Sequence, residues 1–478
     1  MSITKLKSSD LYRVCDPKKF DFSSTADLEE RMSALGQDRA ISAVELGINI
    51  RSKGYNLFCL GPEGTGKTSL VKRILQKEAQ NRPTPDDWAY VYNFDEPYKP
   101  KAINFPAGTA TEFAKDIDKL IEEFSTAIPS VLDSEEYKAA ESIIKEKFKQ
   151  KKEEYVKILQ KKAKGKSVSL LQMQVGLVVA PMKNGEVLSP EAFDELPEEE
   201  KKALIEDLNA MQQEIENTAH DIPSWEEKQR EESKLLREKF IKLTVKKPID
   251  TLRQKYKSIK GAVEFLKNVQ KHIVNNIDEF VPCQEQQTAG AEDDPLSSLL
   301  SRINKPDEDK FSKLKVNVIV KNEKDSGAPI VLLDHPTQSN LVGRVERIQQ
   351  YGALVTDFTL IKAGALHRAN GGFLLMDARK LLTQPYSWDS LKRALASKTV
   401  KIDSPADEST FMTISLDPEP IPLQVKIILT GDEELFEILS DKDPDFRDYF
   451  KVEADFGTLM DRTEENEQEY AKLIGSLS

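Results

Sequence analysis

Gly61-Pro-Glu-Gly-Thr-Gly66-Lys67-Thr68 is the stretch that decides the fold of this chain. It follows a short apolar run, Tyr55 to Leu60, and precedes a helical pattern from Ser69 to Lys77. A glycine-rich loop that joins a strand to a helix and ends in Lys-Thr is typical of a phosphate-binding loop, because its backbone N–H groups turn toward the phosphate. The sequence therefore predicts that the loop binds a nucleoside triphosphate.

The predicted cofactors are ATP and Mg²⁺. Lys67 would reach the β- and γ-phosphate oxygens, and the helix that follows presents its positive amino end to the anion. Thr68 would hold Mg²⁺ through its hydroxyl group. The predicted nucleotide-binding residues are Gly61, Pro62, Glu63, Gly64, Thr65, Gly66, Lys67, Thr68 and Ser69.

Composition excludes several classes of protein. A chain of 478 residues can form several domains without disulfide bonds, and its three cysteines are widely separated and lack metal-ligand spacing. The net charge of −12 argues against a general binder of nucleic-acid backbones. No apolar stretch approaches the ~20 residues that a membrane-spanning helix needs, and the N-terminus lacks an apolar signal core. We expect a cytoplasmic protein with no membrane partner.

The middle of the chain changes character. Residues 28–51 read as a helix pair, and Trp88 to Phe94 as a strand that leads into a Pro-rich loop. Residues 111–280 are charge-rich and nearly free of glycine, which predicts an antiparallel helical arm, and Asn184-Gly185 between apolar runs predicts a β-hairpin within it. Within this arm, five apolar residues follow the three-four spacing of a helix, namely Tyr137, Ile144, Phe148, Tyr155 and Ile158.

After a polar segment, short apolar runs alternate with helical patterns. The runs are 316–320, 331–333, 372–377 and 425–430, as in a parallel sheet that helices cover on both faces. The predicted fold class is therefore α/β, a P-loop nucleotide-binding core split by a long helical insertion with a small β-hairpin. The predicted domains are 1–110, the first part of the core; 111–280, the helical arm; 281–312, a flexible linker; 313–463, the second part of the core; and 464–478, the start of a helical lid.

Asp377 ends the apolar run Phe373-Leu-Leu-Met-Asp377 and is the predicted second carboxylate ligand of Mg²⁺. In many ATPases of this kind the next residue is a glutamate that polarises the attacking water. Here the next residue is Ala378, which leaves nucleotide binding as predicted and makes hydrolysis an open question. Asp334 and Glu346 are the alternative carboxylates for this role.

The run His367-Arg-Ala-Asn370-Gly371-Gly372-Phe-Leu-Leu-Met-Asp377-Ala-Arg-Lys-Leu-Leu resembles the second nucleotide motif of Lon-like ATP-dependent proteases, specifically the bacterial Lon-related branch. Other segments resemble the same family in the same order along nearly the whole chain. They are Tyr90-Val-Tyr-Asn-Phe-Asp-Glu-Pro97 with Phe105-Pro-Ala-Gly108, and residues 334–344, 352–359 and 443–456.

The resemblance implies an AAA+ module that assembles into a hexameric ring, binds ATP between neighbouring subunits and acts on protein substrates. Arg447 would then be an arginine finger supplied to the neighbouring subunit, and Thr430 with Asp432 would sense the γ-phosphate. His367 and Asn370 would face the nucleotide or the ring pore, with a structural turn as the alternative. Tyr351 and Gly352 would lie in a pore loop that grips an unfolded chain.

Lon-like proteases carry a C-terminal domain with a Ser-Lys dyad, in which a desolvated lysine activates the serine. No serine here has such a setting, so we expect the sequence to be part of a longer protein, without its proteolytic domain. The preferred function is the ATP-binding, substrate-remodelling part of such a protease. The alternatives are a nucleotide-dependent scaffold or chaperone that does not hydrolyse ATP, which Ala378 favours, and a DNA-repair type ATPase, against which the acidic charge argues.

Overall fold

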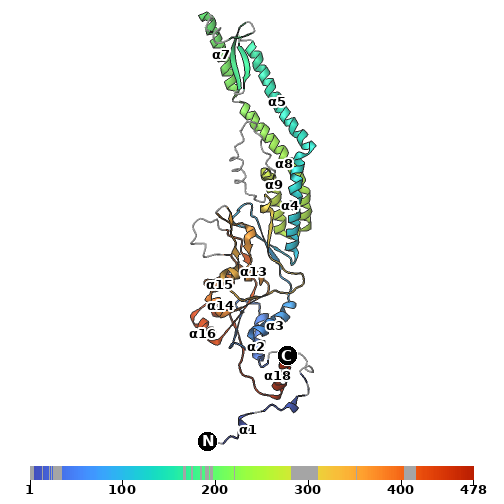
Figure 1. Cartoon of the computed structure of the whole chain (residues 1–478), viewed down its shortest axis with the longest axis vertical. Coiled ribbons are helices and arrows are strands. Elements are labelled where there is room, and N and C mark those ends of the chain that lie inside the picture. The colour runs from blue at the N-terminus through green and yellow to red at the C-terminus, as the bar shows by residue number, and fades with distance from the viewer. Residues whose placement is uncertain are drawn as a thin grey trace. The chain divides into compact units, whose positions relative to one another are not determined.

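The computed structural model describes residues 5–12, 14–20, 22, 24, 35–164, 168–173, 176–183, 186–188, 193, 197–219, 221–280, 310–350, 353–402 and 416–477 (Figure 1). The chain forms two compact units. The first contains Met1–Lys115 with Lys315–Ser478, and the second contains Asp116–Leu314. Each unit is described by itself below.

The first unit is built on a five-stranded parallel sheet in the order β17-β1-β16-β13-β8. Because residues on a strand alternate between faces, Phe58 and Leu60 of β1 join one apolar core, and Leu57 and Cys59 join the other. Burial on both faces explains why the strands read as continuous apolar runs. The strands are β1 (Leu57–Leu60), β8 (Ile330–Leu333), β13 (Phe373–Asp377), β16 (Lys426–Gly431) and β17 (Val452–Asp455).

Helices cover both faces of this sheet, as the sequence predicts for an α/β core. Apolar residues of α2 (Asp38–Asn49) and α3 (Lys67–Gln80) pack on one face. The helices of the second half of the chain pack on the other face, and Figure 1 shows α14, α15 and α16 gathered together there. They are α12 (Gln338–Val342), α13 (Ala365–Arg368), α14 (Ala378–Thr383), α15 (Ser387–Ser397), α16 (Glu433–Lys442) and α17 (Phe446–Tyr449).

One predicted strand lies in a different sheet. Val316–Val320 forms β7, which pairs antiparallel with β2 (Asp87–Val91) in a three-stranded sheet that β3 (Lys101–Phe105) completes. The prediction that the 316–320 run belongs to the parallel sheet is wrong, because a short apolar run fits either kind of sheet and carries no information on strand direction. This second sheet packs through Tyr90 against Phe358 and Ile361.

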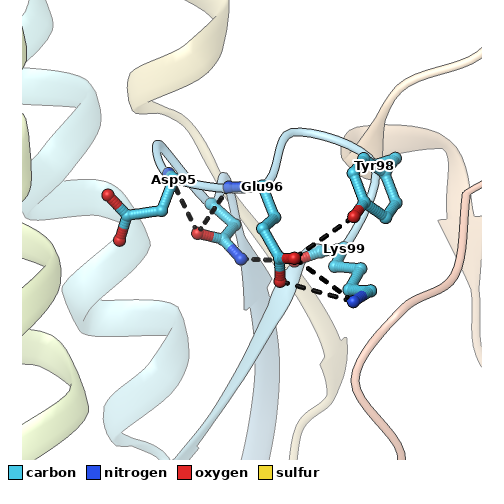
Figure 2. A network of polar contacts seen from close by, with 5 residues as sticks. Asp95, Glu96, Tyr98 and Lys99 are labelled. Carbon is cyan, nitrogen blue, oxygen red and sulfur yellow. Dashed lines mark hydrogen bonds and ion pairs between the residues drawn. The ribbon is translucent and has the colours of Figure 1, made fainter.

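The loop between β2 and β3 is held by its own polar contacts. Asn93 Oδ1 accepts from the backbone N–H groups of Asp95 at 3.2 Å and Glu96 at 3.3 Å, and Asn93 Nδ2 donates to the Lys99 carbonyl at 3.0 Å. The Glu96 carboxylate accepts from the Tyr98 hydroxyl at 3.2 Å and from Lys99 Nζ at 3.3 Å, whereas the Asp95 carboxylate extends away from this network (Figure 2). The Pro-rich segment after β2 is therefore an ordered hairpin loop.

The second unit is mainly helical, with a three-stranded sheet β4-β5-β6. Strands β5 and β6 pair antiparallel on either side of residues 184–185, which themselves lie outside the described residues. On α5 the apolar stripe differs from the prediction at one position, because Ile158 is 48% exposed and its neighbour Leu159 is buried against Met211 of α7. The elements are α4 (Thr109–Asp133, begun in the first unit), α5 (Glu135–Lys164), β4 (Val168–Met173), β5 (Gly176–Lys183), β6 (Glu186–Val187), α7 (Glu198–Ala219), α8 (Asp221–Lys255), α9 (Lys260–Asn275) and α10 (Ile277–Phe280).

The remaining elements are short or terminal. In the predicted lid, α18 (Glu464–Leu477) is a single 14-residue helix. None of the helices in the described ranges is both long and apolar enough to span a membrane. The other elements are α1 (Ser8–Leu11), β9 (Arg344–Val345), β10 (Ile348–Gln350), β11 (Ala353–Val355), β12 (Ile361–Lys362), β14 (Thr399–Val400), β15 (Ile421–Pro422) and the 3-10 turns Pro17–Lys19, Ser312–Leu314 and Phe358–Leu360.

Candidate nucleotide-binding site

The candidate site lies at the carboxyl edge of the parallel sheet, where ligands of open α/β folds bind. The strand register places Thr430 of β16 between Cys59 of β1 and Asp377 of β13. The phosphate loop leaves this edge directly after β1. The sheet therefore brings Lys67, Thr430 and Asp377 to one edge, although more than half of the chain separates the first of them from the other two.

Glycines shape the loop in two ways. Gly64 and Gly66 have φ of 84° and 74°, in the left-handed region, and a side chain at either position would meet open space. Gly61 has φ of 143°, and a Cβ there would lie 2.7 Å from the Phe456 carbonyl oxygen. Gly61 is thus required both by its positive φ and by its close approach to Phe456, which directly follows β17, whereas Gly64 and Gly66 are required by backbone conformation alone.

Lys67 begins α3 and its ammonium group lies over the loop. Its Nζ donates to the carbonyl oxygens of Gly61 and, at 2.7 Å, of Pro62. Burial lowers the pKa of Lys67, and the negative charge of Asp432 is the strongest influence in the other direction. A phosphate group at the loop would offer this ammonium a charged partner in place of two neutral carbonyls.

The predicted metal ligands fit a magnesium ion by their chemistry. The Thr68 hydroxyl is exposed and makes no hydrogen bond within the described part of the chain. Asp377 Oδ1 accepts from the Lys380 backbone N–H at 2.8 Å and so caps α14, which leaves Oδ2 without a hydrogen bond to any described residue. Hydroxyl and carboxylate oxygens are the ligands that Mg²⁺ prefers.

An ion pair that the sequence analysis missed lies beside these residues. Arg379, the second residue of α14, donates from Nη2 to Asp432 Oδ2 at 2.6 Å, and Asp432 also caps α16 by accepting from Leu435 N at 2.8 Å. The hydrogen bond from Arg379 is the main cause of the lowered pKa of Asp432. The only signal in the sequence was the position of Arg379, two residues after Asp377.

The residue after Asp377, the predicted Mg²⁺ carboxylate, does not face the site. Ala378 is fully buried in the apolar core formed with the helices of the second half of the chain. Of the two alternative carboxylates, Glu346 pairs with Arg344 at 2.7 Å. Asp334 is exposed and directly follows β8, whose Leu333 is opposite Met376, so it lies at the carboxyl edge beside Asp377.

The structure does not bring Arg447 to the phosphate loop of its own chain. Arg447 lies on α17, which precedes β17 and therefore sits at the amino edge of the sheet, opposite the loop. Four residues of β1 at about 3.3 Å each separate the two edges by roughly 13 Å. The Arg447 side chain is exposed and makes no hydrogen bond or ion pair with the described residues. Any contact of Arg447 with a nucleotide would thus involve a second copy.

Two further predicted residues have structural surroundings. Asn370 Nδ2 donates to the Pro422 carbonyl and Asn370 Oδ1 accepts from Gln424 N, both at 2.8 Å, at the amino edge of the sheet. His367 is fully buried, and its Nδ1 accepts from Gly364 N at 3.3 Å. Neither side chain faces the phosphate loop, which favours the structural alternative. Tyr351 and Gly352 of the predicted pore loop lie outside the described residues.

The burial of His367 predicts a pH-dependent stability. Burial lowers the pKa of His367 to about 4 from 6.5, so the folded chain keeps this ring neutral while the unfolded chain protonates it below pH 6.5. Stability is thus lost as the pH falls from about 6.5 to about 4, by roughly 3 kcal/mol in total. The measurement is urea unfolding at pH 7.5 and pH 5. His367→Gln should show a smaller difference between the two pH values, and the exposed His335→Gln should behave as wild type; equal pH dependence in all three proteins would contradict the assignment.

Comparison with known proteins identifies two family domains. Residues 326–457 match the family described as "LonB-like, AAA domain", and residues 87–120 match "Lon-like LonC helical domain". The first match contains β8, β13, β16 and β17 but not the phosphate loop. Strand β1, which pairs with both β16 and β17, joins that loop to the matched segment within one sheet.

Individual relatives match shorter stretches. A protein named "Putative Lon protease homolog" from Escherichia coli (strain K12) is 35% identical over 105 residues, which are 21% of this chain and 17% of that protein. The match thus covers about a sixth of the length of this relative. A solved structure of NtrX from Brucella abortus aligns at 16% identity over 27% of this chain and 26% of that chain. A second structure of NtrX, in complex with ADP, aligns at 12% identity over 44% of this chain and 42% of that chain. Both alignments have a TM-score of 0.19, which is too low to show a shared fold.

The fold, the edge-located phosphate loop and the two family matches agree. An AAA domain is a nucleotide-binding domain, and the nucleotide that this loop suits is ATP. Residues 326–457 thus form a LonB-like AAA domain, and the matched stretches of the chain are similar to Lon-related proteins.

Proposed function

We propose that this chain is an ATPase module that engages and unfolds protein substrates for a Lon-like protease. The observation that carries the proposal is the convergence of Lys67, Asp377 and Thr430 at the carboxyl ends of three adjacent strands. This arrangement is what phosphoryl transfer needs from a protein, because its catalysis is mostly positioning and charge stabilisation.

In this proposal each residue has a separate task. The loop N–H groups and Lys67 hold the β- and γ-phosphates, and Thr430 contacts the γ-phosphate from β16. Thr68 and Asp377 would hold Mg²⁺, which when bound would supply positive charge to the phosphate oxygens. Arg447 would reach the nucleotide of a neighbouring copy in a hexameric ring, where its guanidinium stabilises the charge that develops during transfer.

The helical arm, proposed as residues 111–280, would contact protein substrates. The long helices α5 and α8 of this arm carry many exposed charged residues, and such surfaces suit weak, reversible contacts with unfolded chains. The proposed ring would work in the cytoplasm without nucleic acid. The proposed boundaries of the core on either side are residues 1–110 and 313–463, with a linker at 281–312 and a lid from residue 464.

The second candidate is a scaffold or chaperone that binds ATP without hydrolysing it. The burial of Ala378 favours this alternative, because no carboxylate stands at that position to polarise the attacking water. The two functions differ in one measurable respect, which is steady-state ATP turnover beside ATP binding on the purified chain. Turnover supports the motor, and binding without turnover supports the scaffold.

If the chain hydrolyses ATP, Asp334 is the carboxylate that we expect to position the water. Asp334→Asn should lower the turnover number by about 10²-fold, with ATP affinity unchanged, since only the group that directs the water is lost. The matched control is Glu346→Gln, whose amide still accepts the hydrogen bond of Arg344. A turnover number that falls equally in both variants, or in neither, would rule Asp334 out.

A further inference from the structure

A cavity of about 610 Å³ lies at the amino edge of the parallel sheet, the edge opposite the phosphate loop. Its walls come from the segments that enter β1, β13, β16 and β17, together with the chain after α3 and the end of α15. All of these segments belong to the first unit. We call this cavity the amino-edge pocket. Its volume is within the ~300–1,000 Å³ of small-molecule sites.

The charge of the amino-edge pocket is one-sided. Its lining contains five cationic side chains and no aspartate or glutamate, although the chain as a whole has a net charge of −12. Arg82 has an ion pair nearby, with Glu78 at 3.3 Å, but that carboxylate is not part of the lining. Cations that converge on a cavity without carboxylates attract anions. The five are Arg51, Lys53, Arg82, Lys398 and Lys426.

Two of these cations are held in place by the protein. Lys426 is 9% exposed, and its Nζ donates to the carbonyl oxygens of Ile50 at 2.6 Å and Tyr55 at 2.7 Å. Arg82 donates from Nη2 to the Ile48 carbonyl at 2.8 Å, and its guanidinium lies 4.5 Å from the centre of the Phe373 ring. Each keeps an N–H group beyond these bonds, since an ammonium has three donors and a guanidinium five.

The pKa of Lys426 reflects its burial first and the positive charge of Arg82 second. Together they lower this pKa to about 8. An anion in the pocket would oppose both effects, because a negative charge favours the protonated amine. The pocket is therefore arranged to gain from a ligand of opposite charge.

A third cation of the pocket, Lys398, has an unfavourable backbone conformation. Lys398, which directly follows α15, has φ of 54° and is one of three non-glycine residues in the described part of the chain with positive φ. The Leu423 backbone N–H donates to its carbonyl at 2.8 Å and holds this turn. Such conformations persist where the surrounding structure imposes them, often near functional sites.

We propose that the amino-edge pocket binds a small molecule that carries at least two phosphate groups. Phosphate oxygens are the partners that guanidinium and ammonium groups bind best, and five cations exceed what one carboxylate would neutralise. Tyr449 is half-buried on one wall, and Lys53 Nζ lies over its ring at 6.0 Å from the ring centre, which places this ammonium at the pocket wall. The proposal does not depend on ATP hydrolysis at the phosphate loop.

The test uses inorganic pyrophosphate and calorimetric titration at about 150 mM salt. The full chain carries Lys67→Ala, so that the phosphate loop is disabled. We call the chain with both Lys53→Glu and Lys398→Glu the pocket variant. We expect pyrophosphate to bind one saturable site, with a Kd that rises at least about tenfold in the pocket variant, because each substitution replaces an attraction by a repulsion. Both side chains are exposed, and the matched control is the exposed Lys442→Glu on α16, outside the pocket. Unchanged melting temperatures show that the variants are folded.

Further titrations distinguish the two sources of the ligand. If it is a free molecule, ATP affinity in the pocket variant with Lys67 intact stays within about twofold of wild type. If the phosphates belong to a nucleotide held by a second copy, that affinity falls only at concentrations where copies associate, measured by light scattering. The proposal is overturned if pyrophosphate does not bind the Lys67→Ala chain, or binds the pocket variant and the control equally. It is overturned as well if duplex DNA or an acidic peptide binds the pocket where pyrophosphate does not.

Discussion

Lys67→Ala is expected to lower ATP turnover by about 10²–10³-fold and to weaken ATP binding, without unfolding the chain. The lysine would contribute the charge that pairs with the β- and γ-phosphates. Among the described residues its ammonium donates to two carbonyl oxygens of the loop, those of Gly61 and Pro62, and a bound phosphate would replace them. The measurement is steady-state phosphate release beside nucleotide affinity. Lys72→Ala, an exposed lysine of the same helix, is the control. Equal turnover in the two variants would show that the hydrolysis does not depend on this loop.

Arg447→Ala is expected to lower turnover by about 10³–10⁵-fold while ATP affinity stays near that of wild type. The reason is geometric, since Arg447 lies at the sheet edge opposite the phosphate loop and can act only on the nucleotide of another copy. The control is Arg368→Ala, an exposed arginine of α13.

Mixing the two defective chains separates this role from a local structural one. In a mixed ring, an Arg447→Ala chain still has Lys67, and a neighbouring Lys67→Ala chain still has Arg447. An interface that joins these two residues therefore has both the lysine and the arginine that hydrolysis needs. Part of the turnover should therefore return on mixing, although neither chain is active alone. A mixture as inactive as its components, in chains that associate normally, would contradict the assignment of Arg447 as an arginine finger.

The phosphate loop and the strands around it could be predicted from the sequence, because their signals are local. Glycine spacing, the Lys-Thr pair and continuous apolar runs depend only on neighbouring residues, and the parallel sheet confirms the α/β core. The direction of β7 could not be predicted, since an apolar run of five residues fits both kinds of sheet. Leu159 is buried where the sequence predicts Ile158, because the position of α7 decides which residue of α5 is covered. Periodicity within one helix does not determine that position.

The parts of the site that come from tertiary structure were less accessible. Arg379 and Asp432 are 53 positions apart and meet only because β13 and β16 are neighbours. The five cations of the amino-edge pocket come from four separate segments and have no spacing that marks them as a group. The structural role of Asn370 also depends on its partners Pro422 and Gln424, on the segment that enters β16.

We propose above that ATP binds at the carboxyl edge of the sheet. Amide hydrogen exchange of the chain with and without MgATP tests this most directly, because bound phosphates protect the N–H groups that they contact. We expect protection to rise in residues 61–70 and at the ends of β13 and β16, and Lys67→Ala to remove this change. ATP that binds without protecting residues 61–70 would contradict the proposal.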